Sequence, residues 1–408
     1  MVSAGNAEAL GRIADSKPEL VDLALAGELI PDLPDDVLLH AGPPLAADAP
    51  LCGALRGAIL GTLIHEGRAA NAGDAEALLT AGRIRLRSAA DFSVLATYGG
   101  VLSRRTRVFV VENAAAGTRA YSAINEGRGL ALRYGSHDAE TLARYRWLEG
   151  EFAEVLQEAI RAAGRIALFP IISQALQMGD DGHSRQKAAS SLFANLMAPW
   201  IAETCREGIR AARCLRFLAA NEIFFLPLTM AAAKATMRAV EGIPASSLIT
   251  AMAANGHEWG IQVSGLPRKW FTAPVPFIEG RYFEGYSEAD ASPVIGDSEI
   301  AETLGLGAFA MGGAPALARY MGGTVRAMRL MALEMYRITA GESAVFKIPE
   351  LEYRGTPTGI DILKVVEQQI APIFNTGMAH RLAGIGQIGA GFGRVPMACC
   401  AQAAENLQ

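Results

Sequence analysis

The sequence predicts an α+β protein in which two mixed domains flank a small helical domain. Three observations point to this class: strand-like pieces occur in both end regions, a long helical stretch lies between them, and strands and helices do not alternate as in a doubly wound sheet. The chain has 408 residues, which at about 100–200 residues per domain fits two to three domains. We place the boundaries at residues 1–135, 136–240 and 241–408.

The N-terminal region combines turns, one helical pattern and one clear strand. HAGPP at 40–44 is typical of a turn, and the helical pattern runs from Glu66 towards Arg83. The strand is RVFVVE at 107–112, where β-branched and aromatic residues are followed by NAAAG.

The middle region is predicted to be helical. Asp138 is suited to cap a helix whose apolar residues recur every three to five positions, at Leu142, Tyr145, Leu148, Phe152, Val155 and Ile160. Further helices are expected at about 184–218 and 226–240.

The C-terminal region returns to mixed structure. WGIQVS at 259–264 and AVFKIP at 344–349 favour strands, and a helix is expected around 324–339. The longest apolar run, at 304–318, is shorter than the ~20 residues of a membrane span and is interrupted by Gly and Pro. We expect it to be buried core beside a turn.

Composition restricts the function. Charged residues make up 19% of the chain, below the usual share of about 25%, and indicate a globular core rather than disorder. The net charge of −5 argues against nucleic acid and anionic membranes as partners. The first twenty residues lack the pattern of a signal peptide, so a cytoplasmic location is expected. The five cysteines form no CxxC pair and are predicted to be reduced packing residues, with no metal site.

Glycine is in excess: 43 residues, roughly a tenth of the chain, against a usual ~7%. These glycines are expected in turns, at close backbone approaches or around a ligand. GIGQIG at 384–389 matches a dinucleotide-binding pattern, but too few residues follow it for the rest of that fold. No cofactor is therefore predicted.

MGDDGHSRQKAAS at 178–190 places acidic and basic groups before a helix. Asp180 and Asp181 either cap that helix or belong to a site in which Arg185 and His183 meet an anionic substrate. In the second case an aspartate would fix the tautomer of the imidazole of His183.

INEGRGLALRYG at 124–135 sets Asn125, Glu126, Arg128 and Arg133 among three glycines. The stretch is too polar for core and too rich in glycine for a stable helix, so it is either a binding loop or an exposed turn. The fork of an arginine suits a carboxylate or a phosphate.

The C-terminal loops contain further polar groups. Asn255 and Thr272 lie in AANGHEWG and SGLPRKWFTAPV, and Asn375 and His380 lie in FNTGMAHRLAG. A single histidine in such a run is either structural or catalytic. Asp297 and Glu302 occur in GDSEIAETLGLG, which is also typical of a plain helix start.

Together, these strings resemble the YlbE-like family. The matching motifs include HAGPP, VEN at 111–113, NEGRG at 125–129, MGDDGH at 178–183 and GIGQIGAG at 384–391, and the resemblance runs from about residue 36 to the C-terminus. It implies two α+β domains with a small helical domain between them. It also implies a relation to a component of a multi-subunit oxamate carbamoyltransferase of allantoin breakdown.

The chain departs from the family pattern at 87–108, which reads RSAADFSVLATYGGVLSRRTRV, and within MGDDGHSRQK. If the first stretch lines the pocket, the substrate or the reaction differs from that of the family. Arg104, Arg105 and Arg107 either contact an anion or form a solvated run of charge before the strand.

We therefore predict an enzyme of carbamoyl or amide chemistry on a small anionic nitrogen compound such as oxamate, oxalurate or a ureide. Such chemistry needs a cationic clamp, donors for an oxyanion and one acid or base that titrates near neutrality. The predicted catalytic residues are His183, with Asp180 orienting it, and Glu126. The predicted substrate contacts are Asn125, Arg128, Arg133, Arg185, Asn255, Thr272, Asn375 and His380.

Two alternatives stay open: a stand-alone hydrolase or lyase of cyclic amides or ureides, and a non-catalytic subunit of a carbamoyltransferase. The expected partners are a small anion, including carbamoyl phosphate, and either further copies of the chain or the other subunits of a complex.

Overall fold

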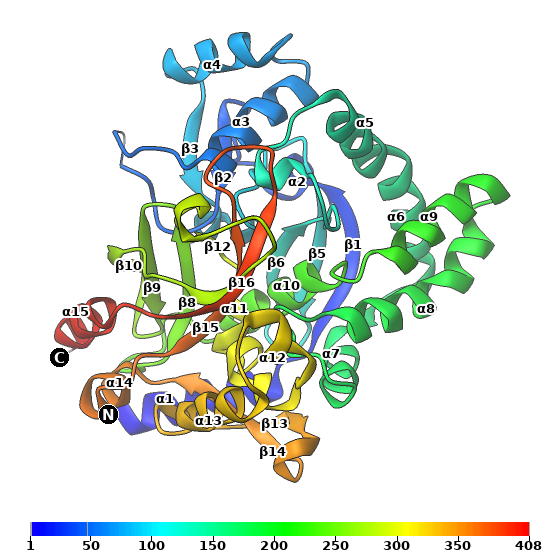
Figure 1. Cartoon of the computed structure of the whole chain (residues 1–408). Coiled ribbons are helices and arrows are strands. Elements are labelled where there is room, and N and C mark those ends of the chain that lie inside the picture. The colour runs from blue at the N-terminus through cyan, green and yellow to red at the C-terminus, as the bar shows by residue number, and fades with distance from the viewer. Residues whose placement is uncertain (1, 47, 408) are drawn as a thin grey trace.

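A computed structural model describes residues 2–46 and 48–407 (Figure 1). Helices and several sheets occur in both end regions, and a helical stretch lies between them, so the predicted α+β class is confirmed. All five cysteines are free, and none of the described helices is long and apolar enough to cross a membrane.

The first sheet contains the strand that the sequence predicted, β5 (Arg107–Asn113). Its strand order is β4 (Val94–Leu95), β6 (Thr118–Ala123), β5, β1 (Pro18–Leu25) and β7 (Ile166–Ala167). The short helix α2 (Ala26–Leu29) follows β1. Helix α10 (Leu226–Arg238) packs on β5 and β6 and is buried from Pro227 to Met237. Most of its residues are apolar, and the buried Lys234 pairs with Glu241 at 3.3 Å.

The helical stretch begins where Asp138 predicted it. The Asp138 carboxylate accepts hydrogen bonds from the backbone N–H groups of Glu140 and Thr141, both at 2.9 Å, and so caps the helix. The helices are α5 (Ala139–Trp147), α6 (Ala153–Ala163), α7 (Leu168–Gln177), α8 (Lys187–Thr204) and α9 (Gly208–Ala220). The expected helix at 184–218 is thus two helices, with a break at residues 205–207.

The C-terminal region contains two further sheets and a hairpin. The strand order of the first sheet is β10 (Leu266–Pro274), β9 (Glu258–Val263), β8 (Ile249–Asn255) and β12 (Ile295–Gly296). The order of the second is β11 (Glu279–Tyr282), β16 (Gln387–Arg394) and β15 (Ile373–Ala379). The hairpin consists of β13 (Thr339–Ile348) and β14 (Arg354–Ile360). The helices are α11 (Ile300–Thr303), α12 (Ala316–Met321), α13 (Val325–Met335), α14 (Ile362–Gln368) and α15 (Met397–Leu407). The apolar run at 304–318 is largely buried, as predicted.

The two ends of the chain are interleaved (Figure 1). Helix α1 (Val2–Asp15) packs on β13 and β14. The Asn6 amide donates to the Ser247 hydroxyl at 2.8 Å and to the Asp361 carboxylate at 3.1 Å. Because the first helix belongs to the C-terminal packing, the domain boundaries given above stay a prediction.

The helix predicted from Glu66 is wrong in its start. Two helices occupy this part, α3 (Gly53–His65) and α4 (Ala72–Thr80), beside the strand pair β2 (Val37–His40) and β3 (Arg85–Ser88). Gly67 has a φ of 70°, which interrupts the chain after α3. The Asn71 side chain accepts from the backbone N–H of Asp74 at 3.0 Å and starts α4.

Three glycines on one face of α3 allow it to approach the segment that carries Arg133. A Cβ added at Gly57 would overlap the carbonyl oxygen of Gly135 and lie 2.7 Å from its Cα. A Cβ at Gly61 would meet the Leu132 side chain, and one at Gly53 would meet the Arg381 carbonyl oxygen. The glycine spacing of four residues keeps these contacts on one side of the helix.

We expect Gly57→Ala to destabilise the protein by about 1–3 kcal/mol, because the new methyl group forces α3 away from the Gly135 backbone. Gly11→Ala in α1 is the matched control: nothing lies within 4 Å of its added Cβ, so it should stabilise by about 0.5–1 kcal/mol. Urea unfolding midpoints measure both changes. Equal effects of the two substitutions would contradict the close contact.

Candidate functional site

A cavity of about 80 Å³ lies where loops from distant parts of the chain meet. It is enclosed by the turn after β4, the segment after β6, the loop before α8, the start of α10, and strands β15 and β16. Its lining residues are Thr97, Tyr98, Asn125, Arg128, Arg133, Tyr134, His183, Ser184, Ile223, Leu226, Ser298, Tyr320, Thr376, Gly377 and Gln387.

Arg133 is held in the cavity wall by its own segment. The Glu126 carboxylate accepts hydrogen bonds from the backbone N–H groups of Leu132 at 2.7 Å and Arg133 at 3.0 Å. Asn125 Oδ1 accepts from the N–H of Gly127 at 2.8 Å. The segment is thus folded back on itself and fixes the position of Arg133.

The guanidinium of Arg133 is buried without a negative partner. The side chain is 5% exposed. Nη2 donates to the Gly127 carbonyl, and the group lies 4.7 Å from the ring centre of Tyr134. In the part of the chain that the structure describes, Nη1 has no hydrogen-bond partner and no carboxylate pairs with this arginine.

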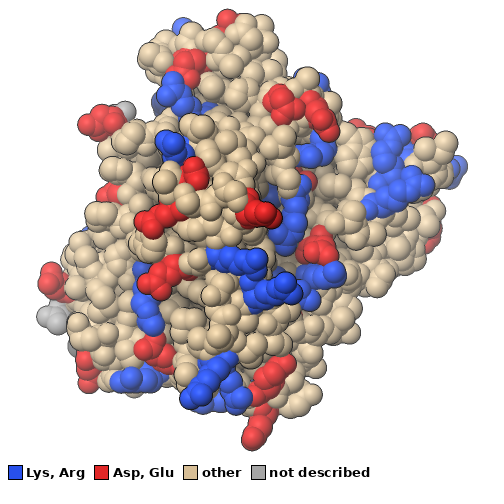
Figure 2. Space-filling view, in the orientation of Figure 1, with Lys and Arg blue, Asp and Glu red and all other residues tan. Residues whose placement is uncertain are grey.

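Arg128 lies at the exposed side of the cavity. Its guanidinium is 5.7 Å from the ring centre of Tyr320, whose hydroxyl accepts a hydrogen bond from Gln387 Nε2 at 2.7 Å. Lys and Arg side chains also gather in the middle of the face drawn in Figure 2, over the region of β16 and α10. The basic charge is local, because the chain as a whole is acidic.

The loop with His183 is tied to β15 by Asp181. One oxygen of the Asp181 carboxylate accepts from the backbone N–H groups of His183 at 3.0 Å and Arg185 at 2.8 Å. The other oxygen accepts from Asn375 Nδ2 at 2.7 Å, and Asn375 Oδ1 accepts from the Ser184 hydroxyl at 2.8 Å. This network joins the helical stretch to the C-terminal region beside the cavity.

His183 is paired with Glu302. Nδ1 of His183 lies 2.9 Å from Oε1 of Glu302, and both side chains are buried. Burial alone would lower the pKa of His183, but the Glu302 carboxylate outweighs it and raises the pKa to about 9. His183 is therefore a cation at neutral pH, and Nε2 is the ring nitrogen left for a ligand.

Glu299 is a second buried carboxyl group close to His183. It is fully buried, and neither of its side-chain oxygens has a hydrogen-bond partner among residues 2–46 and 48–407. Burial raises its pKa to about 7, although the charge of His183 acts in the opposite direction. Burial thus favours the protonated, uncharged form of Glu299.

Comparison with known proteins assigns the chain to a family. The sequence profile described as "Oxamate carbamoyltransferase subunit AllG" matches residues 84–298. The Oxamate carbamoyltransferase subunit AllG of Escherichia coli (strain K12) is 39% identical over all of this chain and 97% of its own length. The chain belongs to the AllG family.

Two further proteins are similar to this AllG-family chain. The "Uncharacterized protein YahG" of Escherichia coli (strain K12) is 37% identical and is matched over 98% of this chain and 84% of its own length. A crystal structure of a conserved protein of unknown function from Enterococcus faecalis V583 superposes with a TM-score of 0.97 at 36% identity, covering all of this chain and 97% of that one. The expected relation to an oxamate carbamoyltransferase component is confirmed at the level of the family, whereas the YlbE-like name stays a prediction.

The structure brings several of the predicted site residues of this AllG-family chain together. Asn125, Arg128, Arg133 and His183 line the cavity, and Asn375 lies directly behind it. Glu126 supports the segment from within and does not line the cavity.

The predicted pair of Asp180 and His183 is not formed, because Glu302 occupies the Nδ1 side of the imidazole. Asp180 instead accepts from the N–H of Ala189 at 2.9 Å at the start of α8 and lies 3.4 Å from Nε of Arg185. Burial raises the pKa of Asp180 to about 6. Arg185 thus faces an acidic group, without a hydrogen bond to it, and does not line the cavity.

Three predicted substrate contacts lie outside the cavity. Asn255 donates to the Pro43 carbonyl at 3.0 Å and accepts from the backbone of His257 and Glu258. Thr272 donates to the Glu258 carboxylate at 3.0 Å. His380 Nδ1 accepts from the N–H of Leu382 at 3.0 Å. Each of these side chains organises a turn or a strand end.

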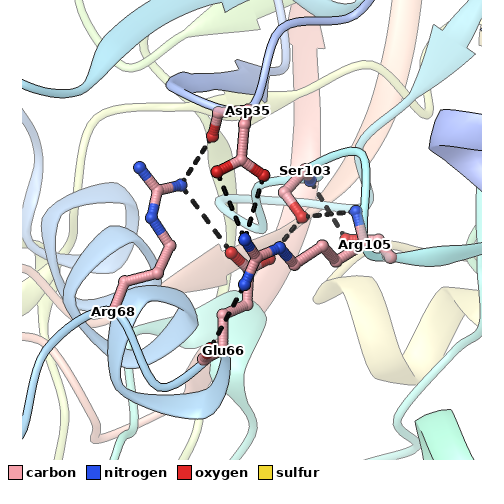
Figure 3. A network of polar contacts seen from close by, with 6 residues as sticks. Asp35, Glu66, Arg68, Ser103 and Arg105 are labelled. Carbon is pink, nitrogen blue, oxygen red and sulfur yellow. Dashed lines mark hydrogen bonds and ion pairs between the residues drawn. The ribbon is translucent and has the colours of Figure 1, made fainter. Parts of the chain in front are cut away.

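Two of the arginines named in the divergent stretch 87–108, Arg105 and Arg107, have local partners, and Figure 3 shows those of Arg105. The Arg105 guanidinium donates two hydrogen bonds of 3.1 and 3.2 Å to the Asp35 carboxylate, and the backbone N–H of Arg105 donates to the Ser103 hydroxyl. That hydroxyl donates to the Glu66 carboxylate at the end of α3. The backbone N–H of Arg107 donates to the Glu149 carboxylate at 2.7 Å, and Nε of Arg107 donates to the backbone carbonyl of Glu149 at 2.9 Å. This stretch reaches the cavity through Thr97 and Tyr98 instead.

Sequence analysis missed several residues of the site. Tyr98, Tyr134, Tyr320 and Gln387 form much of its wall, and Glu302 pairs with His183. The sequence marked Glu302 as a polar group in GDSEIAETLGLG, a string also typical of a plain helix start, but not as a partner of His183; the tyrosines carry no charge that would mark them. No group of three or more His, Cys, Asp or Glu within residues 2–46 and 48–407 is arranged to hold a metal ion.

We expect Glu299→Gln to become more stable relative to wild type as pH rises. The folded wild type keeps a proton on Glu299 up to about pH 7, whereas the unfolded chain loses it near the ordinary pKa of 4.5. The stability due to this group therefore falls as pH rises between these values, and the glutamine variant gains up to about 3 kcal/mol over that window.

Denaturant unfolding at the two ends of that pH window measures this change. The exposed residue Glu367 in α14 provides the control variant Glu367→Gln, whose difference from wild type should not vary with pH. A constant difference for Glu299→Gln would contradict the buried, protonated state of Glu299.

Proposed function

We propose that the chain is a subunit of a carbamoyltransferase and that its cavity binds the anionic group of a small reactant such as oxamate or carbamoyl phosphate. The buried, unpaired guanidinium of Arg133 carries this proposal. A buried charge is unfavourable unless a partner compensates it, and the planar fork of an arginine matches two oxygens of a carboxylate or phosphate. An anionic ligand would supply the missing partner.

The other polar groups of the cavity fit the same ligand. Arg128 and the protonated His183 add positive charge, and Asn125 offers an amide. The Glu302 pair keeps His183 protonated, so Nε2 would donate a hydrogen bond to an oxygen that gains negative charge during acyl transfer. His183 would therefore act as a hydrogen-bond donor, and not as the acid or base titrating near neutrality that the sequence predicted.

Carbamoyl transfer is the reaction that this arrangement would assist. A nitrogen–carbon bond forms between the acceptor amide and the carbamoyl carbon, and the carbon–oxygen bond to phosphate breaks. The proton lost by the acceptor nitrogen ends on the released phosphate. Positive charge at Arg133 and His183 would stabilise the phosphate as it leaves. The name of the AllG relative supports a role within an enzyme of several subunits.

We expect Arg133→Gln to weaken the binding of inorganic phosphate and of oxamate by about 10–100-fold, the loss of hydrogen bonds to a charged group. Isothermal titration of the purified chain measures this affinity. Arg56→Gln is the matched control, because Arg56 forms an exposed ion pair with Glu76 away from the cavity, and it should bind as wild type does. Unaltered binding by Arg133→Gln would overturn the proposal.

A further inference from the structure

A second cavity of about 230 Å³ adjoins the first. Tyr98 and Gly377 line both cavities and form the wall between them. The remaining lining residues of the second cavity are Pro276, Phe277, Ile278, Tyr282, Glu288, Ala291, Ser292, Pro293, Val294 and Met378. The larger space therefore lies directly behind the wall of the anion cavity.

The two cavities differ in charge. Arginine and histidine side chains line the first, whereas no Lys, Arg or His lines the second. Apart from the exposed Glu288 carboxylate, the lining of the second cavity is mostly apolar, and the Ser292 hydroxyl lies beside the Cys52 thiol. Such walls suit an uncharged, largely apolar group.

Tyr98 is fixed in an unusual conformation at this wall. Its φ is 53°, in the left-handed region that residues other than glycine rarely adopt. The hydroxyl of Tyr98 accepts from the backbone N–H of Ala379 at 2.8 Å, and its ring centre lies 4.9 Å from that of Tyr134. Strained conformations of this kind are concentrated at functional sites.

The residues after Tyr98 couple this wall to the anion cavity. A Cβ added at Gly99 would lie 3.1 Å from the carbonyl oxygen of Arg133. A Cβ added at Gly100 would lie 3.2 Å from the Cβ of Arg133. These two glycines therefore allow the turn at 97–100 to lie against the backbone of Arg133. The position of the Tyr98 ring is fixed relative to the guanidinium.

From this geometry we infer that Tyr98 is a specificity-determining residue that separates two subsites: an anion subsite at Arg133, and a subsite for an uncharged, largely apolar group in the second cavity. The inference rests on the proposed function, because it places the anionic end of the ligand at Arg133. The tyrosine ring limits how large a group the first cavity accepts on the side of Gly377. The divergent stretch 87–108 thus acts on the ligand through Tyr98 rather than through its arginines.

The test compares oxamate with N-ethyl and N-butyl oxamate, whose substituents would point from the anion subsite towards Tyr98. Wild type should bind N-butyl oxamate at least about tenfold more weakly than oxamate, because the ring blocks the added carbons. Tyr98→Gly, which adopts a positive φ readily, should reduce this difference to less than about threefold. Titration calorimetry with each ligand measures the ratio.

Three further variants test whether the change in selectivity comes from removal of the Tyr98 ring. Tyr98→Phe keeps the ring and should keep the wild-type selectivity. Tyr98→Asn also tolerates the left-handed conformation and, being shorter, should relax the selectivity in part. Ser292→Phe added to Tyr98→Gly fills the second cavity and should restore discrimination against N-butyl oxamate.

Phosphate affinity distinguishes the two ways of failing. Selectivity is compared as the ratio of N-butyl oxamate to oxamate affinity within each variant, because Tyr98 also lines the anion cavity and its substitution alters the surroundings of a bound anion. If Tyr98→Gly and Tyr98→Asn bind phosphate normally and still reject N-butyl oxamate, the role of Tyr98 is wrong while the anion site stands. If wild type binds neither phosphate nor oxamate, the proposed function fails and the inference fails with it.

Discussion

A buried guanidinium without a carboxylate partner sets the main constraint on this molecule, since such a group is stable only where the surrounding backbone holds it firmly. At Arg133 the Glu126 carboxylate holds the backbone in place, because it accepts hydrogen bonds from two N–H groups of the same segment. The carbonyl of Gly127 accepts a hydrogen bond from the guanidinium itself. The glycines of α3 allow the helix to support the segment from the other side at backbone distance. An acidic partner for Arg133 would compensate its charge but would fill the space that we propose for an anion.

The same constraint explains why distant parts of the chain are joined beside the cavity. Asp181 connects the loop before α8 to Asn375 on β15, and Glu302 connects that loop to α11. Both carboxylates accept several donors each, so neither link can be removed without leaving buried N–H groups unpaired. The helical stretch and the C-terminal region are therefore fixed relative to each other by the residues that position His183.

Local patterns in the sequence predicted the elements that depend on local chemistry. Asp138 marked a helix start, RVFVVE marked a strand, and the run at 304–318 was apolar enough to indicate core. Helix α3 was missed because its glycines, which count against a helix, are required by contacts with Gly135 that no local pattern shows. The loop with Asn125, Arg128 and Arg133 was found because its composition suits neither core nor helix.

The pairing of side chains could not be predicted in the same way. Asp180 is three positions from His183 in sequence, yet Glu302, more than a hundred positions away, forms the hydrogen bond. Asn255, Thr272 and His380 have the chemistry of ligand contacts, but their partners at Pro43, Glu258 and Leu382 use that chemistry for turns and strand ends. Residue type indicates what a side chain can bind, whereas the tertiary contacts decide which group it meets.

The acidic residues around the cavity would oppose an anion if all of them were ionised. Burial raises the pKa of Asp297 well above its usual range and that of Glu299 to about 7, so burial favours the uncharged form of both groups. Burial also raises the pKa of Glu302, although the imidazole of His183, which it faces, acts in the opposite direction. Arg133 and Arg128 form no ion pair among the described residues. An anion bound at Arg133 would further favour the protonated form of Glu299, so anion binding and proton uptake act in the same direction.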